Sequence, residues 1–173
     1  MTAPAKDPLL TTAKVVLKIV AVGIAIALAV SCFGFVALFA DANGIFTERF
    51  AGAPPEATWW TIGLAVLSTA LLVMSLLFVF DLIRIVGSVG EGDPFRPVNA
   101  DRLRRMAWLV LGVQICTLLL APLTFMLLDY LPEVAGRANH GGLGGFVLAL
   151  VLFLLARVFR HGTVIRDDLE GTV

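Results

Sequence analysis

Charged residues are scarce in this sequence. Lysine, arginine, aspartate and glutamate make up 15% of its 173 residues, whereas a soluble domain has about 25%. The 13 basic residues are balanced by 13 acidic ones, so the formal net charge is zero. A chain without basic excess does not bind nucleic acid directly through bulk charge. Intrinsic disorder is excluded as well, because it requires low hydrophobicity and high charge.

Cysteine and histidine are also rare, with two of each. Cys32 and Cys116 form no C-x-x-C pair and fall inside apolar runs, so we expect them to pack as small buried side chains. His140 and His161 flank the last apolar run, and at its opposite ends they cannot share a zinc ion. We therefore expect no catalytic residue, no metal and no cofactor, and we predict that the protein is not an enzyme.

Apolar residues dominate what is present, at 59% of the chain. About 20 apolar residues in a helix cross the hydrocarbon core of a bilayer, and four runs are long enough. They predict membrane spans at about residues 15–40, 58–80, 106–128 and 140–158. Alternation with period two, which a membrane β-barrel requires, is missing from these runs. The predicted fold is all-α: a four-helix transmembrane bundle forming a single membrane domain over residues 1–173.

The basic residues fix the predicted orientation, because cytoplasmic loops are enriched in lysine and arginine. One side of the membrane receives eleven of them: Lys6, Lys14, Lys18, Arg84, Arg96, Arg102, Arg104, Arg105, Arg157, Arg160 and Arg166. The other side receives Arg49 and Arg137. The prediction is N-in/C-in, with a cytoplasmic loop at 81–105 and a cytoplasmic tail at 159–173. A cleaved signal peptide is the competing interpretation of the first run, but about 22 apolar residues follow Lys18, more than the 7–15 of a signal peptide.

Small residues four apart predict where helices pack closely, since lipid provides no hydrophobic drive for association. Such spacings occur in three of the spans, at Gly23/Ala27/Ser31, Gly112/Cys116 and Gly141/Gly145/Ala149. They suggest a compact bundle with short antiparallel connections. The Gln114 amide should find a partner across this bundle. Frequent glycine and alanine in membrane helices remain the alternative explanation of the spacings.

The loop between the second and third spans shows helix boundaries. The second helix should end near Val89, where Gly90 and Gly92 follow, and Asp81 should pair with Arg84 one turn later. Asn99 is expected to cap a third helix running from about Ala100 to Leu128, with Asp101 in its first turn. The tail from Val158 onward is expected to continue the fourth helix as a short amphipathic stretch.

Two segments resemble a known family. They are Gly92-Asp93-Pro94-Phe95 with Asn99 and Arg102-Leu103-Arg104-Arg105, and Val158-Phe159 with Gly162 and a chain end running from Arg166 to Thr172-Val173. With four spans, the chain resembles the bacterial membrane family DUF2975, which has no established activity. The resemblance implies the bacterial cytoplasmic (inner) membrane. It also implies a partner, because members are often encoded beside a small helix-turn-helix regulator of the Cro/C1 type.

The loop and the tail are expected to be neighbours on the cytoplasmic side. Our hypothesis is that they form one platform that holds such a regulator at the bilayer. The candidate contact residues are Asp93, Pro94, Phe95, Asn99, Arg102, Leu103, Arg105, Ile165, Asp168, Leu169, Thr172 and Val173. The plainer interpretation is that these residues build a stable loop and that the arginines serve orientation alone.

Two other function classes stay open. One is a small channel or facilitator for an uncharged solute, lined by Ser68, Ser75, Gln114 and Thr117. The other is an assembly subunit of a larger membrane complex. A homo-oligomer is compatible with each of these functions.

Overall fold

The computed structural model describes residues 8–40, 47–48, 51–91, 95–128 and 142–170, with positions 38, 39 and 164–170 described by their backbone alone. Four long helices account for most of these residues: α1 (Pro8–Ala40), α3 (Ala57–Gly90), α4 (Pro97–Met126) and α6 (Gly144–Glu170). Strands are absent from the described part of the chain. Each helix contains a stretch long and apolar enough to cross a membrane. The predicted all-α, four-span fold is confirmed.

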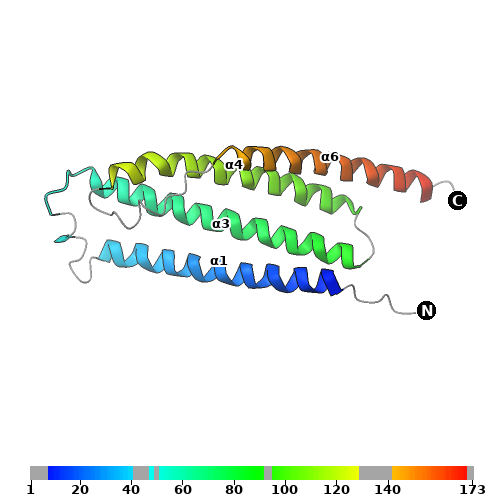
Figure 1. Cartoon of the computed structure of the whole chain (residues 1–173), viewed down its shortest axis with the longest axis horizontal. Coiled ribbons are helices and arrows are strands. Elements are labelled where there is room, and N and C mark those ends of the chain that lie inside the picture. Colours follow the sequence, from blue (N-terminus) through cyan, green and yellow to red (C-terminus); the bar gives the residue numbers. More distant parts are fainter. Residues whose placement is uncertain (1–7, 41–46, 49–50, 92–94, 129–141, 171–173) are drawn as a thin grey trace.

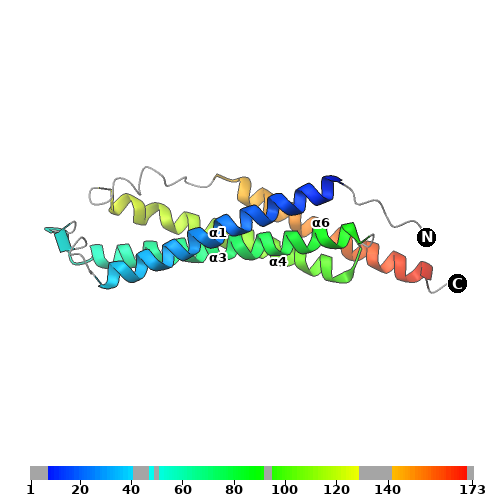
Figure 2. The same ribbon diagram turned by 90° about the horizontal axis from the view of Figure 1, so that it is seen from below.

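The helices lie roughly along one axis, and α1 begins at the end of the molecule where α6 finishes (Figure 1). The extensive helix–helix contacts join α1 to α3, α3 to α4, and α4 to α6. Each helix of the bundle therefore packs mainly on its neighbours in sequence. The view turned by 90° shows α1 crossing α3 at an angle (Figure 2).

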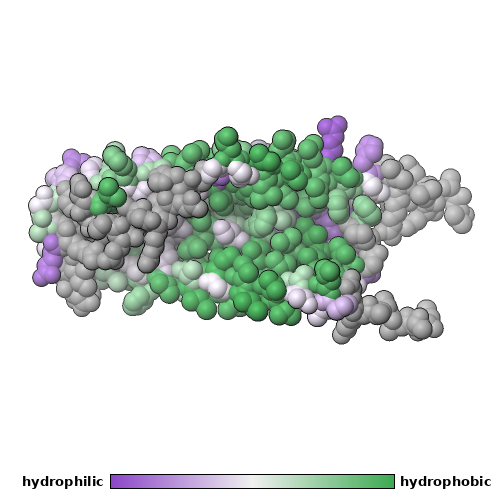
Figure 3. All heavy atoms as spheres, viewed as in Figure 1, coloured by the Kyte–Doolittle hydropathy of each residue, from purple (hydrophilic) through white to green (hydrophobic). Residues whose placement is uncertain are grey.

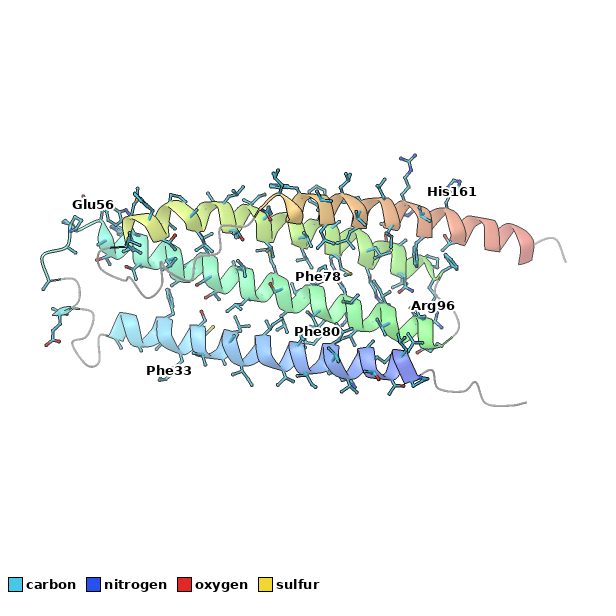
Figure 4. The ribbon with its side chains drawn as sticks, viewed as in Figure 1. Phe33, Glu56, Phe78, Phe80, Arg96 and His161 are labelled. Atoms are coloured by element: carbon cyan, nitrogen blue, oxygen red, sulfur yellow. The ribbon has the colours of Figure 1, made fainter. Side chains whose placement is uncertain are left out.

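The middle of the molecule is covered by apolar side chains, and hydrophilic residues gather toward its two ends (Figure 3). Large apolar side chains are widely exposed there, with Phe33 at 75% and Leu150 at 59%. Figure 4 shows Phe33 of α1 pointing away from the other helices. Such a continuous apolar surface suits lipid and not water.

The buried core is small and lies between α3, α4 and α6. It consists of Ile85, Leu103, Met106, Ala107, Leu152 and Ala156. Helix α1 adds no residue to this cluster, and its own buried side chain is Ala21. The interior is therefore concentrated on α4, which has a packed neighbour on each side.

The boundary of α3 agrees with the prediction, but the start of α4 corrects it. Helix α3 ends at Gly90. Helix α4 begins at Pro97, which occupies the first helical turn, and Arg96 is the capping residue in an extended conformation. Proline suits this position because its missing N–H would have no helical partner. Asn99 therefore lies inside the helix instead of capping it, and Asp101 lies beyond the first turn.

The small-residue spacings mark helix contacts in two spans out of three. A Cβ on Gly112 would lie 2.7 Å from the Met74 sulfur of α3, and a Cβ on Gly145 would overlap the Gln114 side chain of α4. Gly23 of α1, by contrast, has open space where its Cβ would be. Gly141 lies outside the described residues. The spacing in the first span therefore does not mark a close approach at Gly23.

Candidate functional site at the arginine-rich end

The end where α1 begins and α6 finishes carries seven arginines with described side chains. They are Arg84 of α3, Arg96 of the connection, Arg102, Arg104 and Arg105 of α4, and Arg157 and Arg160 of α6. We call this the arginine-rich end. Figure 4 shows Arg96 there and Glu56 at the opposite end. Its specific contacts join α3, α4, α6 and the connection between α3 and α4.

Asp81 of α3 is the centre of the first contact. Its side chain is 1% exposed, and Arg105 of α4 donates to it through Nε, at 2.6 Å, and through Nη2. The predicted partner, Arg84, lies 3.8 Å away. The predicted pairing of Asp81 with Arg84 is therefore present, but it is the weaker of the two ion pairs that Asp81 makes. A carboxylate this buried needs a bidentate donor, and Arg105 from the neighbouring helix supplies it.

Asn99 is the centre of the second contact and is fully buried. Its Nδ2 donates to the Ser88 hydroxyl of α3 at 2.6 Å, and that hydroxyl donates to the Ile85 carbonyl. On the other side Arg102 donates to Asn99 Oδ1 at 3.0 Å. This chain of donors runs from a guanidinium group to a backbone carbonyl. It fixes the register of α3 against α4, because a shift by one residue would leave buried polar atoms without partners.

The connection between α3 and α4 packs against α6. The rings of Phe95 and Phe159 have centroids 5.3 Å apart, within the range of a favourable aromatic pair. A Cβ on Gly162 would lie 2.9 Å from the Phe95 ring, so the glycine makes room for it. One turn into α4, Asp101 accepts a hydrogen bond from Arg160 of α6 at 2.7 Å. The expected proximity of the loop and the beginning of the tail is therefore present.

An ion pair bridges the connection between α3 and α4. Arg96 Nη1 lies 2.9 Å from Glu91 Oε2. Asp93 and Pro94, both candidate contact residues, fall between them and lie outside the described residues. The ion pair links the end of α3 to the start of α4.

The other candidate residues divide into three groups. Phe95, Asn99, Arg102 and Arg105 take part in the contacts above. Leu103 is 5% exposed and belongs to the apolar core, so it is corrected from a partner contact to a packing residue. Ile165, Asp168 and Leu169 lie on the backbone of α6, confirming that the tail continues the fourth helix. Their side chains, and all of Thr172 and Val173, lie outside the described residues.

Sequence reasoning missed the roles of Asp81 with Arg105, Ser88 with Asn99, and Asp101 with Arg160. The first two pairs could have been found from the hairpin. Asp81 and Arg105 are about equally far from the connection, and so are Ser88 and Asn99, which is where an antiparallel pair of helices brings residues together. The third pair depends on how α6 packs against α4. No short connection joins these two helices, so the sequence does not predict their register.

A further polar contact lies within the apolar stretch. Gln114 of α4 donates to the Gly142 carbonyl at 3.1 Å, next to the close approach of Gly145. The prediction that its amide finds a partner across the bundle is confirmed. Ser31 of α1 lies 3.2 Å from the Thr69 hydroxyl of α3. Because Thr69 itself donates to the Ala65 carbonyl, Ser31 is the donor between the two helices.

Residues that could hold a metal or act as nucleophiles are dispersed. Among the described residues no three of histidine, cysteine, aspartate and glutamate are grouped closely enough to bind a metal ion. His161 is exposed on α6, and His140 lies outside the described residues. Cys116 is partly buried, but Cys32 is exposed on α1. The expectation that both cysteines are buried in the protein is therefore wrong for Cys32.

Comparison with known proteins identifies a family. No curated protein and no solved structure matches the chain. A family described as protein of unknown function (DUF2975) matches residues 3–173, essentially the whole chain. The chain, with its four membrane-length helices, belongs to the DUF2975 family.

Proposed function

We propose that this protein is a non-enzymatic membrane protein whose arginine-rich end holds a small DNA-binding regulator at the bacterial inner membrane. The docking surface would combine the connection between α3 and α4 with the last turns of α6. The observation that carries the proposal is the packing of Phe95 on Phe159 beside Gly162. It supports a single composite surface instead of two independent segments.

The extension of α6 supports a role in binding. The uncharged part of α6 ends at Ala156, before Arg157 and Arg160, yet the helix continues to Glu170 and projects beyond the ends of α3 and α4 (Figure 1). A helical extension outside the apolar belt is a common form of partner-binding element. Its sequence, Val164 to Glu170, combines three apolar residues with four charged ones.

The proposal places both termini in the cytoplasm. It is supported by the distribution of basic residues, eleven against two, along the positive-inside rule. Reporters fused after Val173 test this placement. A reporter that is active only in the cytoplasm should be active there, and activity of a reporter that requires export would contradict the orientation.

Recovery of a regulator from native cells tests the function. The full chain with an N-terminal tag, extracted in mild detergent, should retain a small DNA-binding protein that mass spectrometry identifies. Deletion of residues 164–173 should abolish its recovery. Phe159→Ala should lower recovery severalfold, because the connection loses its contact with α6. Phe146→Ala, on the same helix but outside this contact, is the matched control and should leave recovery unchanged.

Retention of the same regulator by the deletion variant would overturn the proposal, and so would the absence of a DNA-binding protein in the wild-type sample. A small channel or facilitator for an uncharged solute is the alternative function. Ser68, Gln114 and Thr117, expected to line its path, each donate to a backbone carbonyl. Solute flux into proteoliposomes stays its direct test.

A further inference from the structure

An open cavity of about 580 Å³ lies on the surface of α4 at the arginine-rich end. Four arginines line it, Arg84 from α3 and Arg102, Arg104 and Arg105 from α4, together with Asp101 and Trp108. Four guanidinium groups around one carboxylate make this a positively charged pocket. Its volume is in the range of small-molecule sites.

The arginines of this cavity are not equally engaged. Arg105 is bound to Asp81 through two nitrogens, and Arg102 donates to Asn99. Arg84 and Arg104 lie 3.8 and 3.9 Å from Asp81 and Asp101, beyond hydrogen-bond distance. Those carboxylates already have shorter partners, Arg105 and Arg160. Arg84 and Arg104 therefore keep guanidinium donors for an anion, and both side chains are more than half exposed.

The position of the cavity at the edge of the apolar belt favours an anion that belongs to a lipid. Trp108 is 63% exposed and lies one turn from Arg104 and Arg105, on the side of the apolar belt. Its ring is held edge-on against Phe153 of α6, with centroids 5.4 Å apart. Tryptophan concentrates at the level of lipid headgroups. The cavity thus joins free guanidinium donors to a fixed aromatic ring at the depth where lipid phosphates meet acyl chains.

We propose that this cavity binds the phosphate of an anionic phospholipid, of the phosphatidylglycerol or cardiolipin class. Arg84 and Arg104 donate to the phosphate oxygens, and the Trp108 ring packs against the first carbons of the acyl chains. Basic pockets between membrane helices bind such headgroups. Arg102 and Arg105, which line the cavity, are also candidate partner contacts, but the lipid proposal rests on Arg84, Arg104 and Trp108 and does not depend on a protein partner.

Quenching of Trp108 by brominated lipid tests the proposal. The full chain has three tryptophans, so Trp59→Phe with Trp60→Phe leaves Trp108 as the reporter. This protein is placed in nanodiscs of phosphatidylcholine that contain a minor share of brominated phosphatidylglycerol or, in a parallel sample, brominated phosphatidylcholine. The anionic lipid should quench Trp108 more strongly than the zwitterionic one at equal share.

Matched charge variants distinguish a site from a general attraction. Arg84→Gln with Arg104→Gln should weaken the preference for the anionic lipid roughly thirtyfold, as expected when two basic contacts are lost. Lys18→Gln with Arg157→Gln removes the same charge from exposed positions on α1 and α6, and it should keep the preference. Circular dichroism and gel filtration confirm that each variant is folded.

Three outcomes would overturn the proposal. Equal quenching by the two lipids would show that the cavity has no preference for an anionic headgroup. An equal loss of preference in both charge variants would show diffuse attraction instead of a site. Displacement of the brominated phosphatidylglycerol by dilute inorganic phosphate would assign the cavity to a soluble anion instead of a lipid.

Discussion

Helices α1 and α4 are both long and apolar enough to cross a membrane, but they are held in the fold in different ways. Helix α4 packs on both α3 and α6 and contributes Leu103, Met106 and Ala107 to the buried core. Helix α1 packs mainly on α3, and its hydrogen bond to that helix joins Ser31 to Thr69. Helix α1 is the more apolar of the two, yet it lies outside the buried core. Polar contacts with its neighbours therefore decide which apolar helix lies at the centre of the fold.

The surfaces beside the two helices also differ in polarity. The cavity on α4 is lined by arginines, whereas the groove between α1 and α3, of about 520 Å³, is lined almost wholly by apolar side chains, including Cys32, Val36 and Met74. The contacts of α4 include a buried ion pair, whereas those of α1 are apolar apart from the hydrogen bond of Ser31 with Thr69. Three substitutions test this difference, from the largest expected effect to the smallest.

Arg105→Gln removes the bidentate partner of Asp81. The buried carboxylate keeps Arg84 at 3.8 Å as its nearest cation, so we expect the free energy of unfolding to fall by about 2–3 kcal/mol, the range for hydrogen bonds to charged groups. Reversible unfolding in mixed detergent micelles measures the loss. Arg104→Gln is the control, because its contact with Asp101 is exposed and long. Equal losses of unfolding free energy in the two variants would show that the ion pair of the buried Asp81 is no stronger than the exposed contact of Asp101.

Gly145→Val tests the contact between α4 and α6. A Cβ at this position overlaps the Gln114 side chain, so either that side chain moves and loses its hydrogen bond to the Gly142 carbonyl or the helices separate. Overpacking of this kind costs about 1–3 kcal/mol. Gly144→Val is the matched control, since nothing lies within 4 Å of its Cβ position. The same unfolding measurement should show a loss for Gly145→Val that is clearly larger than that for Gly144→Val. A larger loss for Gly144→Val would contradict the packing of α6 on α4.

Ser31→Ala removes the donor that joins α1 to α3. Interhelical hydrogen bonds in membrane proteins are worth about 0.6 kcal/mol on average, so we expect the smallest effect of the three. A double-mutant cycle with Thr69→Ala isolates the pair, and its coupling energy should match the single loss. A coupling as large as the effect of Arg105→Gln would show that α1 is held as specifically as α4.

Much of this architecture could be predicted from the amino-acid pattern. Run length predicts four membrane helices, because only a closed set of backbone hydrogen bonds is stable in lipid. Gly90 marks the end of α3, whereas the start of α4 at Pro97 was missed because Asn99 was expected to be the cap. The polar Gln114 predicted a contact across the bundle, since an unpaired amide in hydrocarbon is costly. These conclusions depend on local chemistry and on the bilayer as solvent.

The tertiary structure decided which side chains meet. Asn99 has the chemistry of a helix cap, yet the packing of α3 against α4 buries it as the partner of Ser88. Arg102, Arg104 and Arg105 follow one another closely in sequence, and only their place beside α3 and α6 binds Arg105 to Asp81 while Arg104 is left at the cavity. Apolar side chains favour insertion of a helix into the membrane, and one apolar residue can replace another there with little effect on insertion. The pairing of a buried charge depends on a partner from another helix, so it is fixed only once the helices are in place.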